Sequence, residues 1–116
     1  MRWGAVAVCL GFLAGCGGDE EQALTPAQAE IAEIRQALEV RPDAPLLHFQ
    51  LGQTYRKQGF VDSARAAFER SIGLYGAFAE AHLALAQIYY EDGDLERSVA
   101  AYEQTVRFDS RNAAAF

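Results

Sequence analysis

An internal repeat of 34 residues constrains the fold of this chain more than any other feature. Laying residues 45–78 over 79–112 without a gap gives eight identities in 34 positions, among them Leu51/Leu85 and Tyr55/Tyr89. The matched apolar residues recur at helical spacing, and each unit is interrupted once, at a Gly. Each unit is therefore predicted to form two antiparallel helices.

A further helix is predicted over residues 26–40. Thr25 and Gln28 form a Thr-x-x-Gln capping box at its start, and apolar residues then recur at steps of three and four. Pro42 disfavours helical geometry at the residue before it, so we expect this helix to end near Val40.

The residue types within each unit resemble the tetratricopeptide repeat (TPR) family, whose 34-residue pattern is W-x2-L-G-x2-Y, then A-x3-F, then P. The two units read His48-x2-Leu51-Gly52-x2-Tyr55 with Ala64-x3-Phe68, and His82-x2-Leu85-Ala86-x2-Tyr89 with Ser98-x3-Tyr102. His replaces the leading aromatic in both units, Ala86 and Ser98 are other small residues, and Gly76 and Ser110 stand in place of the closing Pro. These substitutions keep residue size or the ability to form a turn. The resemblance implies an all-α fold in which antiparallel helix hairpins stack into a short right-handed solenoid.

The repeat register also assigns the rest of the chain. Residues 26–116 would form the TPR domain, with 26–40 as the second half of an incomplete repeat, 45–78 and 79–112 as two full repeats, and 113–116 as the start of a further one. Small residues at Gly52/Ala86, Ala64/Ser98 and Ser71/Thr105 are expected to allow close helix packing.

The first residues read as a targeting segment. Arg2 precedes an almost wholly apolar run that is too short to span a bilayer. Residues 1–15 are therefore predicted to be a signal peptide. The tetrapeptide Leu13-Ala14-Gly15-Cys16 resembles the lipobox of bacterial lipoproteins, which implies cleavage before Cys16 and acylation of this residue. General secretory cleavage at nearby small residues is the alternative.

Residues 16–25 would then form the lipidated Cys and a flexible tether to the domain. In such lipoproteins the fully modified Cys carries three acyl chains, which is more than the two membrane-binding groups that stable anchoring requires. The resemblance to lipoproteins implies a lipid-anchored protein of the bacterial cell envelope, on the periplasmic face. Gly17 replaces the Asp that retains such proteins at the inner membrane, which favours the outer membrane.

Charge and motifs exclude several functions. The net charge is −6, which argues against binding of nucleic acid. No catalytic motif occurs, so we expect neither an enzyme nor a cofactor. His48 and His82 occupy equivalent repeat positions and are expected to be packed and hydrogen-bonded rather than metal ligands. The acidic run at residues 91–96 lacks EF-hand spacing, and Asp there is expected to cap the next helix.

The TPR resemblance implies a groove lined by the first helix of each unit, which binds an extended peptide or a partner helix. The residues at groove positions are Leu46, Phe49, Gln53, Arg56, Lys57, Glu80, Leu83, Gln87, Tyr90 and Glu91. Phe49 and Leu83 provide apolar contacts, and Gln53 and Gln87 form a ladder of amides. Phe49 and Gln53 stand where the chaperone-tail subclass has Lys and Asn, so that function is rejected.

We therefore expect a membrane-anchored TPR lipoprotein that mediates protein–protein interaction or complex assembly. One alternative is that the TPR segment is the N-terminal module of a longer protein whose active domain follows residue 116. Another is an oligomerising spacer, because an uncovered apolar end suggests a homo-oligomer. The groove face could also merely contact solvent or other parts of the protein.

Overall fold

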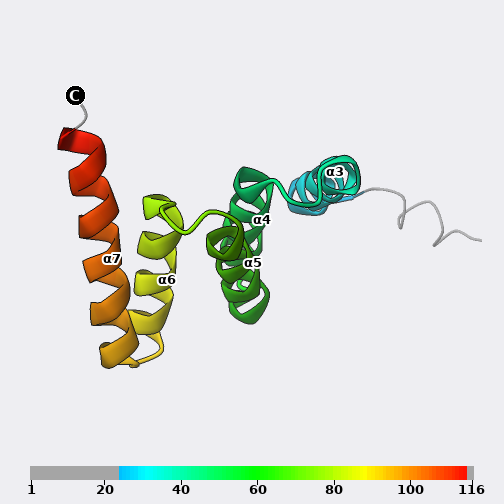
Figure 1. The fold of residues 1–116 in the computed structure, drawn as a ribbon. Helices are drawn as coiled ribbons and strands as arrows, with labels where there is room; N and C mark the ends of the chain where they lie inside the picture. The colour runs from blue at the N-terminus through cyan, green and yellow to red at the C-terminus, as the bar shows by residue number, and fades with distance from the viewer. Residues whose placement is uncertain (1–23, 115–116) are drawn as a thin grey trace, which may run out of the picture.

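The computed structural model describes residues 24–114 of the chain, and all of its regular structure in that range is helical. The helices are α3 (Pro26–Val40), α4 (Pro45–Lys57), α5 (Val61–Leu74), α6 (Ala79–Glu91) and α7 (Leu95–Ala114). Figure 1 shows them following one another across the molecule from α3 to α7. The all-α solenoid of helix hairpins predicted from the repeat is confirmed.

The capping box predicted at the start of α3 is present. The backbone N–H of Gln28 donates to Thr25 Oγ1 at 3.1 Å, and the backbone N–H of Thr25 donates to Gln28 Oε1 at 3.0 Å. These two bonds satisfy N–H groups that the first turn of a helix leaves unpaired. α3 ends at Val40, two residues before Pro42.

Each hairpin turns at a glycine in the left-handed backbone region. Gly59 has φ of 87° and Gly93 has φ of 84°. In both turns the next residue donates its N–H back to the helix, from Phe60 to Tyr55 O at 3.0 Å and from Asp94 to Tyr89 O at 2.9 Å. Side chains other than Gly are strained at this φ, which explains why the two units share this residue.

The core joins the two units. Ala64 and Phe68 of α5 form one buried cluster with Ala84, Leu85 and Ile88 of α6. Small residues lie where helices pack closely, as predicted: Gly52 is buried, Ala64 is fully buried and Ser98 is 2% exposed. Ser98 Oγ also donates to Ala86 O of the facing helix at 3.0 Å. Packing of the second unit on the first therefore buries apolar side chains of both units.

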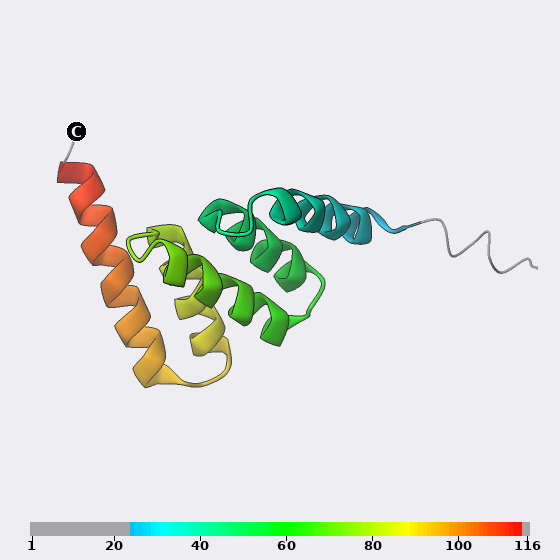
Figure 2. The ribbon, with the colours of Figure 1, turned by 45° about the vertical axis from the view of Figure 1, so that its right-hand side comes forward.

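The helices stack in chain order. Most contacts between elements lie within the α4–α5 and α6–α7 hairpins and between the successive pairs α3–α4 and α5–α6. Figure 2 shows the two hairpins side by side, with α3 at one end and α7 at the other. Each helix therefore packs mainly on the helices next to it in sequence, as in a solenoid.

The end of the second repeat differs from the sequence-based expectation. The register ends the second repeat at residue 112 and starts a further one at 113, but α7 continues without a break through Ala114. The first unit ends at Leu74, before Gly76. The second unit has Ser110 at the position of Gly76, and the alanines that follow favour a continuing helix.

The predicted signal peptide, residues 1–15, and the lipid attachment site Cys16 lie outside the described residues. So do the last two residues of the expected further repeat, 115–116. Within residues 24–114, no helix combines the length and hydropathy needed to cross a membrane.

Candidate functional site

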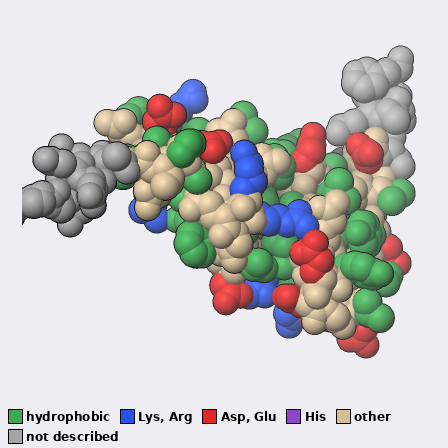
Figure 3. All heavy atoms as spheres, turned by 180° about the vertical axis from the view of Figure 1, so that it is seen from behind, with side chains coloured by type: hydrophobic (Ala, Val, Ile, Leu, Met, Phe, Trp, Pro, Cys, Tyr) green, Lys and Arg blue, Asp and Glu red, His purple; other side chains and the backbone are tan. Residues whose placement is uncertain are grey.

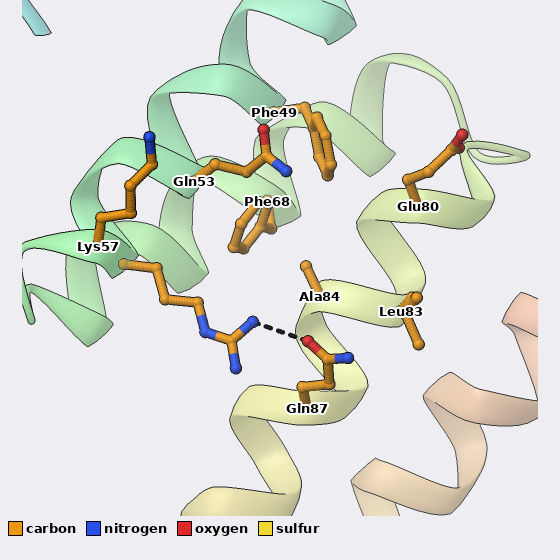
Figure 4. Close-up of a pocket in the computed structure, with 9 residues that line it drawn as sticks. Phe49, Gln53, Lys57, Phe68, Glu80, Leu83, Ala84 and Gln87 are labelled. Atoms are coloured by element: carbon orange, nitrogen blue, oxygen red, sulfur yellow. Dashed lines mark hydrogen bonds between the residues drawn. The ribbon is translucent and has the colours of Figure 1, made fainter. Parts of the chain in front are cut away.

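A hollow of about 650 Å³ lies where α4 and α6 face each other. Figure 4 shows Phe49 and Gln53 of α4 and Ala84 and Gln87 of α6 around it, with Phe68 between the helices and with Lys57, Glu80 and Leu83 pointing outward at its edges. The lining residues are Phe49, Gln53, Arg56, Lys57, Phe68, Glu80, Leu83, Ala84 and Gln87. The first helices of the two units thus form one continuous concave surface.

The apolar part of the hollow is built from aromatic rings. The ring of Phe49 lies 5.5 Å from that of Phe68 and 4.9 Å from that of Phe78, centroid to centroid. Phe68 is fully buried and Leu83 is 36% exposed. Rigid, close-packed rings below and an accessible Leu beside them form a preformed contact for one apolar side chain.

The polar part links the two units through Arg56. Its Nη1 donates to Gln87 Oε1 at 2.8 Å, and its Nη2 donates to Glu91 Oε2 at 3.0 Å. The Arg56 side chain is 29% exposed and that of Glu91 is 60% exposed. The Arg56 charge is therefore balanced within the protein, and the Gln87 carbonyl oxygen is already occupied. The two amides of the expected ladder therefore differ: the oxygen of Gln87 accepts a hydrogen bond from Arg56, whereas the amide of Gln53 makes no bond to Arg56.

The concave surface continues from α4 onto α3. A second hollow of about 350 Å³ shares Gln53 and Lys57 with the first and is also lined by Glu30 and Glu33. Lys57 Nζ lies 3.9 Å from Glu30 Oε1. Lys57 is therefore partly balanced by acidic side chains, and the surface as a whole is not cationic.

Most sequence-predicted groove residues meet in the hollow between α4 and α6. Seven of the ten line it, namely Phe49, Gln53, Arg56, Lys57, Glu80, Leu83 and Gln87, and Glu91 is held at its edge by Arg56. Leu46 and Tyr90 do not line it and are 55% and 63% exposed. Phe68, which the sequence places only in the repeat motif, and Ala84, which the sequence does not single out, also line the hollow.

The two histidines are structural, as predicted. His48 Nε2 lies 2.8 Å from Pro42 O, and His82 Nε2 lies 2.8 Å from Gly76 O. A carbonyl oxygen only accepts, so each histidine carries a proton on Nε2 and donates it. The ring of His82 also stacks on Phe108. Among the described residues, no group of three or more His, Cys, Asp or Glu side chains is arranged to hold a metal ion.

The repeat tyrosines make hydrogen bonds to the preceding helix. Arg35 of α3 donates to Tyr55 Oη, and Tyr89 Oη donates to Glu69 Oε2 of α5 at 3.3 Å. Arg35 and Glu69 are 34 residues apart, so these bonds are equivalent. Burial raises the pKa of the Tyr89 phenol, and the neighbouring Glu69 carboxylate adds to the rise.

Comparisons with known proteins agree with this architecture. Residues 49–113 match a family model described as tetratricopeptide repeat. A crystal structure of MamA is similar with a TM-score of 0.72 and 22% sequence identity, over 76% of this chain and 52% of that one. A structure of MamA MSR-1 C2 gives 0.67 and 22%, over 74% and 49%. This chain thus spans about half the length of those proteins, and such identities show the fold alone. No curated protein matches.

Proposed function

Since this chain belongs to the tetratricopeptide repeat family, we propose that its concave surface binds an extended segment of a partner protein and so assembles a complex. The observation that carries this proposal is the hollow between α4 and α6, where an accessible apolar contact lies beside polar side chains. Ligand sites typically combine these two features, an apolar wall and a few oriented polar groups. The proposed role is binding without chemical conversion.

The lining defines the kind of segment that fits. One apolar side chain would lie against Phe49 and Leu83, and the Gln53 amide would pair with the peptide backbone, to which it can both donate and accept. The Arg56 charge is balanced by Glu91. A segment with an apolar anchor is therefore favoured over an acidic tail, which would need unpaired cations.

A binding comparison of two matched variants tests this assignment. Leu83→Ser with Gln53→Ala alters the hollow, whereas Val40→Ser with Gln36→Ala alters two exposed positions of α3 outside it. We expect the first variant to recover its partner from cell-envelope extract at least about tenfold less well than the unmodified protein, because apolar and hydrogen-bond contacts are lost. The second variant should recover it normally. Equal recovery by both variants would refute the groove assignment.

We further propose that the protein is anchored to the bacterial cell envelope through acyl chains on Cys16, facing the periplasm, with the outer membrane favoured. Support comes from the lipobox-like sequence Leu13-Ala14-Gly15-Cys16, the preceding apolar run and Gly17. The anchor would hold the groove close to a membrane surface, where envelope complexes assemble.

Fractionation of a Cys16→Ser variant tests the anchor. The unmodified protein should sediment with membranes, and the variant should not, since the only proposed attachment site is removed. Continued sedimentation of the variant with membranes after a salt wash would contradict acylation at Cys16.

A further inference from the structure

The concave surface carries more negative than positive charge. Four carboxylates and two cations line its two hollows or lie at their edge, namely Glu30, Glu33, Glu80, Glu91, Arg56 and Lys57. Figure 3 shows acidic and basic side chains interspersed over one face of the molecule, without an extended basic patch. The concave surface therefore holds an excess of two negative charges.

Two of the four carboxylates already have a cationic partner. Glu91 Oε2 accepts from Arg56 Nη2 at 3.0 Å, and Glu30 Oε1 lies 3.9 Å from Lys57 Nζ. These pairs use both cations of the surface, and Arg56 is also bonded to the Gln87 oxygen. The paired side chains are therefore weak attractors for a charged ligand.

Glu33 and Glu80 are the two carboxylates that remain. Both residues are exposed, and within residues 24–114 neither lies within ion-pair distance of a basic side chain. Glu80 lines the hollow between α4 and α6, and Glu33 lines the second hollow, between α3 and α4. An exposed carboxylate that the protein itself does not pair attracts a cationic group of a ligand.

The two carboxylates lie along the same surface as the apolar contact. Glu80 precedes Leu83 by three residues on α6, so the two side chains are neighbours on one helix. The hollow that contains Glu33 shares Gln53 with the hollow that contains Leu83. A ligand that places an apolar side chain against Leu83 therefore has one free carboxylate next to this contact and another further along the surface, on α3.

We propose that the segment bound by the concave surface is basic: an extended stretch of a partner protein with one apolar anchor and Lys or Arg residues on both sides of it. This inference rests on the proposed function of the surface and adds the charge of its ligand. The anchor contacts Phe49 and Leu83, one cation pairs with Glu80, and another pairs with Glu33.

The segment of this chain that precedes α3 has the wrong charge to be the occupant. Residues 17–23 carry three carboxylates and no basic side chain, and like charges oppose binding to an acidic surface. Gly17 and Glu21 stand 34 residues before Leu51 and Tyr55, so the segment also lacks the apolar residues with which the first helix of a repeat packs. The complementary charge must come from a different sequence.

Three synthetic peptides of about nine residues are the probes. Each has a central Leu, and the residues on both sides of it are Lys in the first peptide, Gln in the second and Glu in the third. Titrated into isotope-labelled protein, the Lys peptide should shift the backbone NMR signals of Gln53 and Leu83 and bind about three- to tenfold more tightly than the Gln peptide, as expected of two exposed ion pairs. The Glu peptide should bind most weakly, and all differences should shrink in about 0.5 M salt.

Two variants of equal net charge separate local pairing from general attraction to an acidic protein. Glu33→Gln with Glu80→Gln removes the two unpaired carboxylates of the surface, whereas Glu39→Gln with Glu103→Gln removes two exposed carboxylates that line neither hollow. We expect the first variant to bind the Lys and Gln peptides about equally, and the second to keep the preference for Lys. The first variant should bind the Gln peptide as the unmodified protein does, because the apolar contact is unchanged.

The charge of the ligand and the use of the groove can fail separately. Equal binding of the Lys and Gln peptides with shifts at Gln53 and Leu83, or an equal loss of preference in both variants, would overturn the basic segment and leave the groove assignment standing. Shifts confined to residues outside the two hollows, or none at up to about 5 mM peptide, would overturn both. Nuclear Overhauser effects between residues 17–23 and Leu83 in the free protein would make the chain itself the occupant and overturn the assignment to a partner.

Discussion

Gly52 of α4 lies so close to the ring of Phe68 that a Cβ atom built on this glycine would come within 2.7 Å of ring atom Cε1 and 2.8 Å of Cδ1. Phe68 is fully buried, so its ring cannot move aside freely. The equivalent pair in the second unit is Ala86 and Tyr102, and Tyr102 is 39% exposed. The glycine therefore allows the first hairpin to close over the aromatic core and over the floor of the groove.

Gly52→Ala is accordingly predicted to destabilise the protein by about 1–3 kcal/mol. The steric cost of the added methyl group against Phe68 is expected to exceed the gain from the higher helix propensity of Ala. Urea unfolding followed by circular dichroism measures this change. Gly73→Ala is the matched control, because nothing lies within 4 Å of its Cβ position and it is also in a helix. This control should leave stability unchanged or raise it by up to about 1 kcal/mol. Equal stability of the two variants would contradict the packing described.

The Arg56–Glu91 pair is predicted to contribute little to stability. Its side chains are 29% and 60% exposed, so solvent screens the attraction and a double-mutant cycle should give a coupling of about 0.2–1 kcal/mol. Arg56→Ala and Glu91→Ala, alone and combined, form the cycle. A coupling of several kcal/mol would mean that the pair is desolvated and that the groove is closed at this edge.

Alkaline pH is predicted to destabilise the fold through Tyr89. Burial and Glu69 raise the pKa of this phenol in the folded protein, so the folded state holds the proton more tightly than the unfolded state does. The stabilisation is complete below the unfolded pKa of about 10 and is lost as pH rises from there through the folded pKa. Urea unfolding between pH 8 and 11, roughly spanning this range, should show a shallower decline for Tyr89→Phe than for the unmodified protein. Parallel curves would contradict this.

Gln58 provides a prediction of the opposite sign. Its Nε2 is buried and meets no acceptor among the described residues. Gln58→Leu should therefore keep the free energy of unfolding unchanged or raise it by up to about 1 kcal/mol, because an apolar side chain of similar size replaces the unpaired amide. Gln58→Glu buries a carboxylate at the same point and should lower stability. Thermal unfolding of both variants decides, and a lower midpoint for Gln58→Leu than for Gln58→Glu would refute the assignment.

The helices could be predicted because the residues that begin and end them act locally, and because the helix-ending residues recur in both repeats. Gly59 and Gly93 end the first helix of each unit through the same left-handed turn, and Thr25 caps α3. The end of α7 could not be read in this way. The repeat register predicts a boundary after residue 112, but register alone does not end a helix when no Gly or Pro interrupts it.

The candidate site could be predicted only in outline. The TPR resemblance places Phe49, Gln53 and Leu83 at groove positions, and they do line the hollow. Residue spacing does not reveal that Arg56 forms an ion pair with Glu91, because that pair depends on side-chain conformations across two helices. It also does not show that Tyr90, on the same helix as Leu83, stays outside the hollow.

Site-specific photocrosslinking tests the central claim, that the concave surface is the binding surface, most directly. A photoreactive phenylalanine analogue placed at Gln53 lies in the hollow, and the same analogue at Gln36, which is also exposed, lies on α3 outside it. Irradiation in living cells should give a protein adduct of defined mass from position 53 and none from position 36. The same adducts from both positions, or none from position 53, would contradict the account.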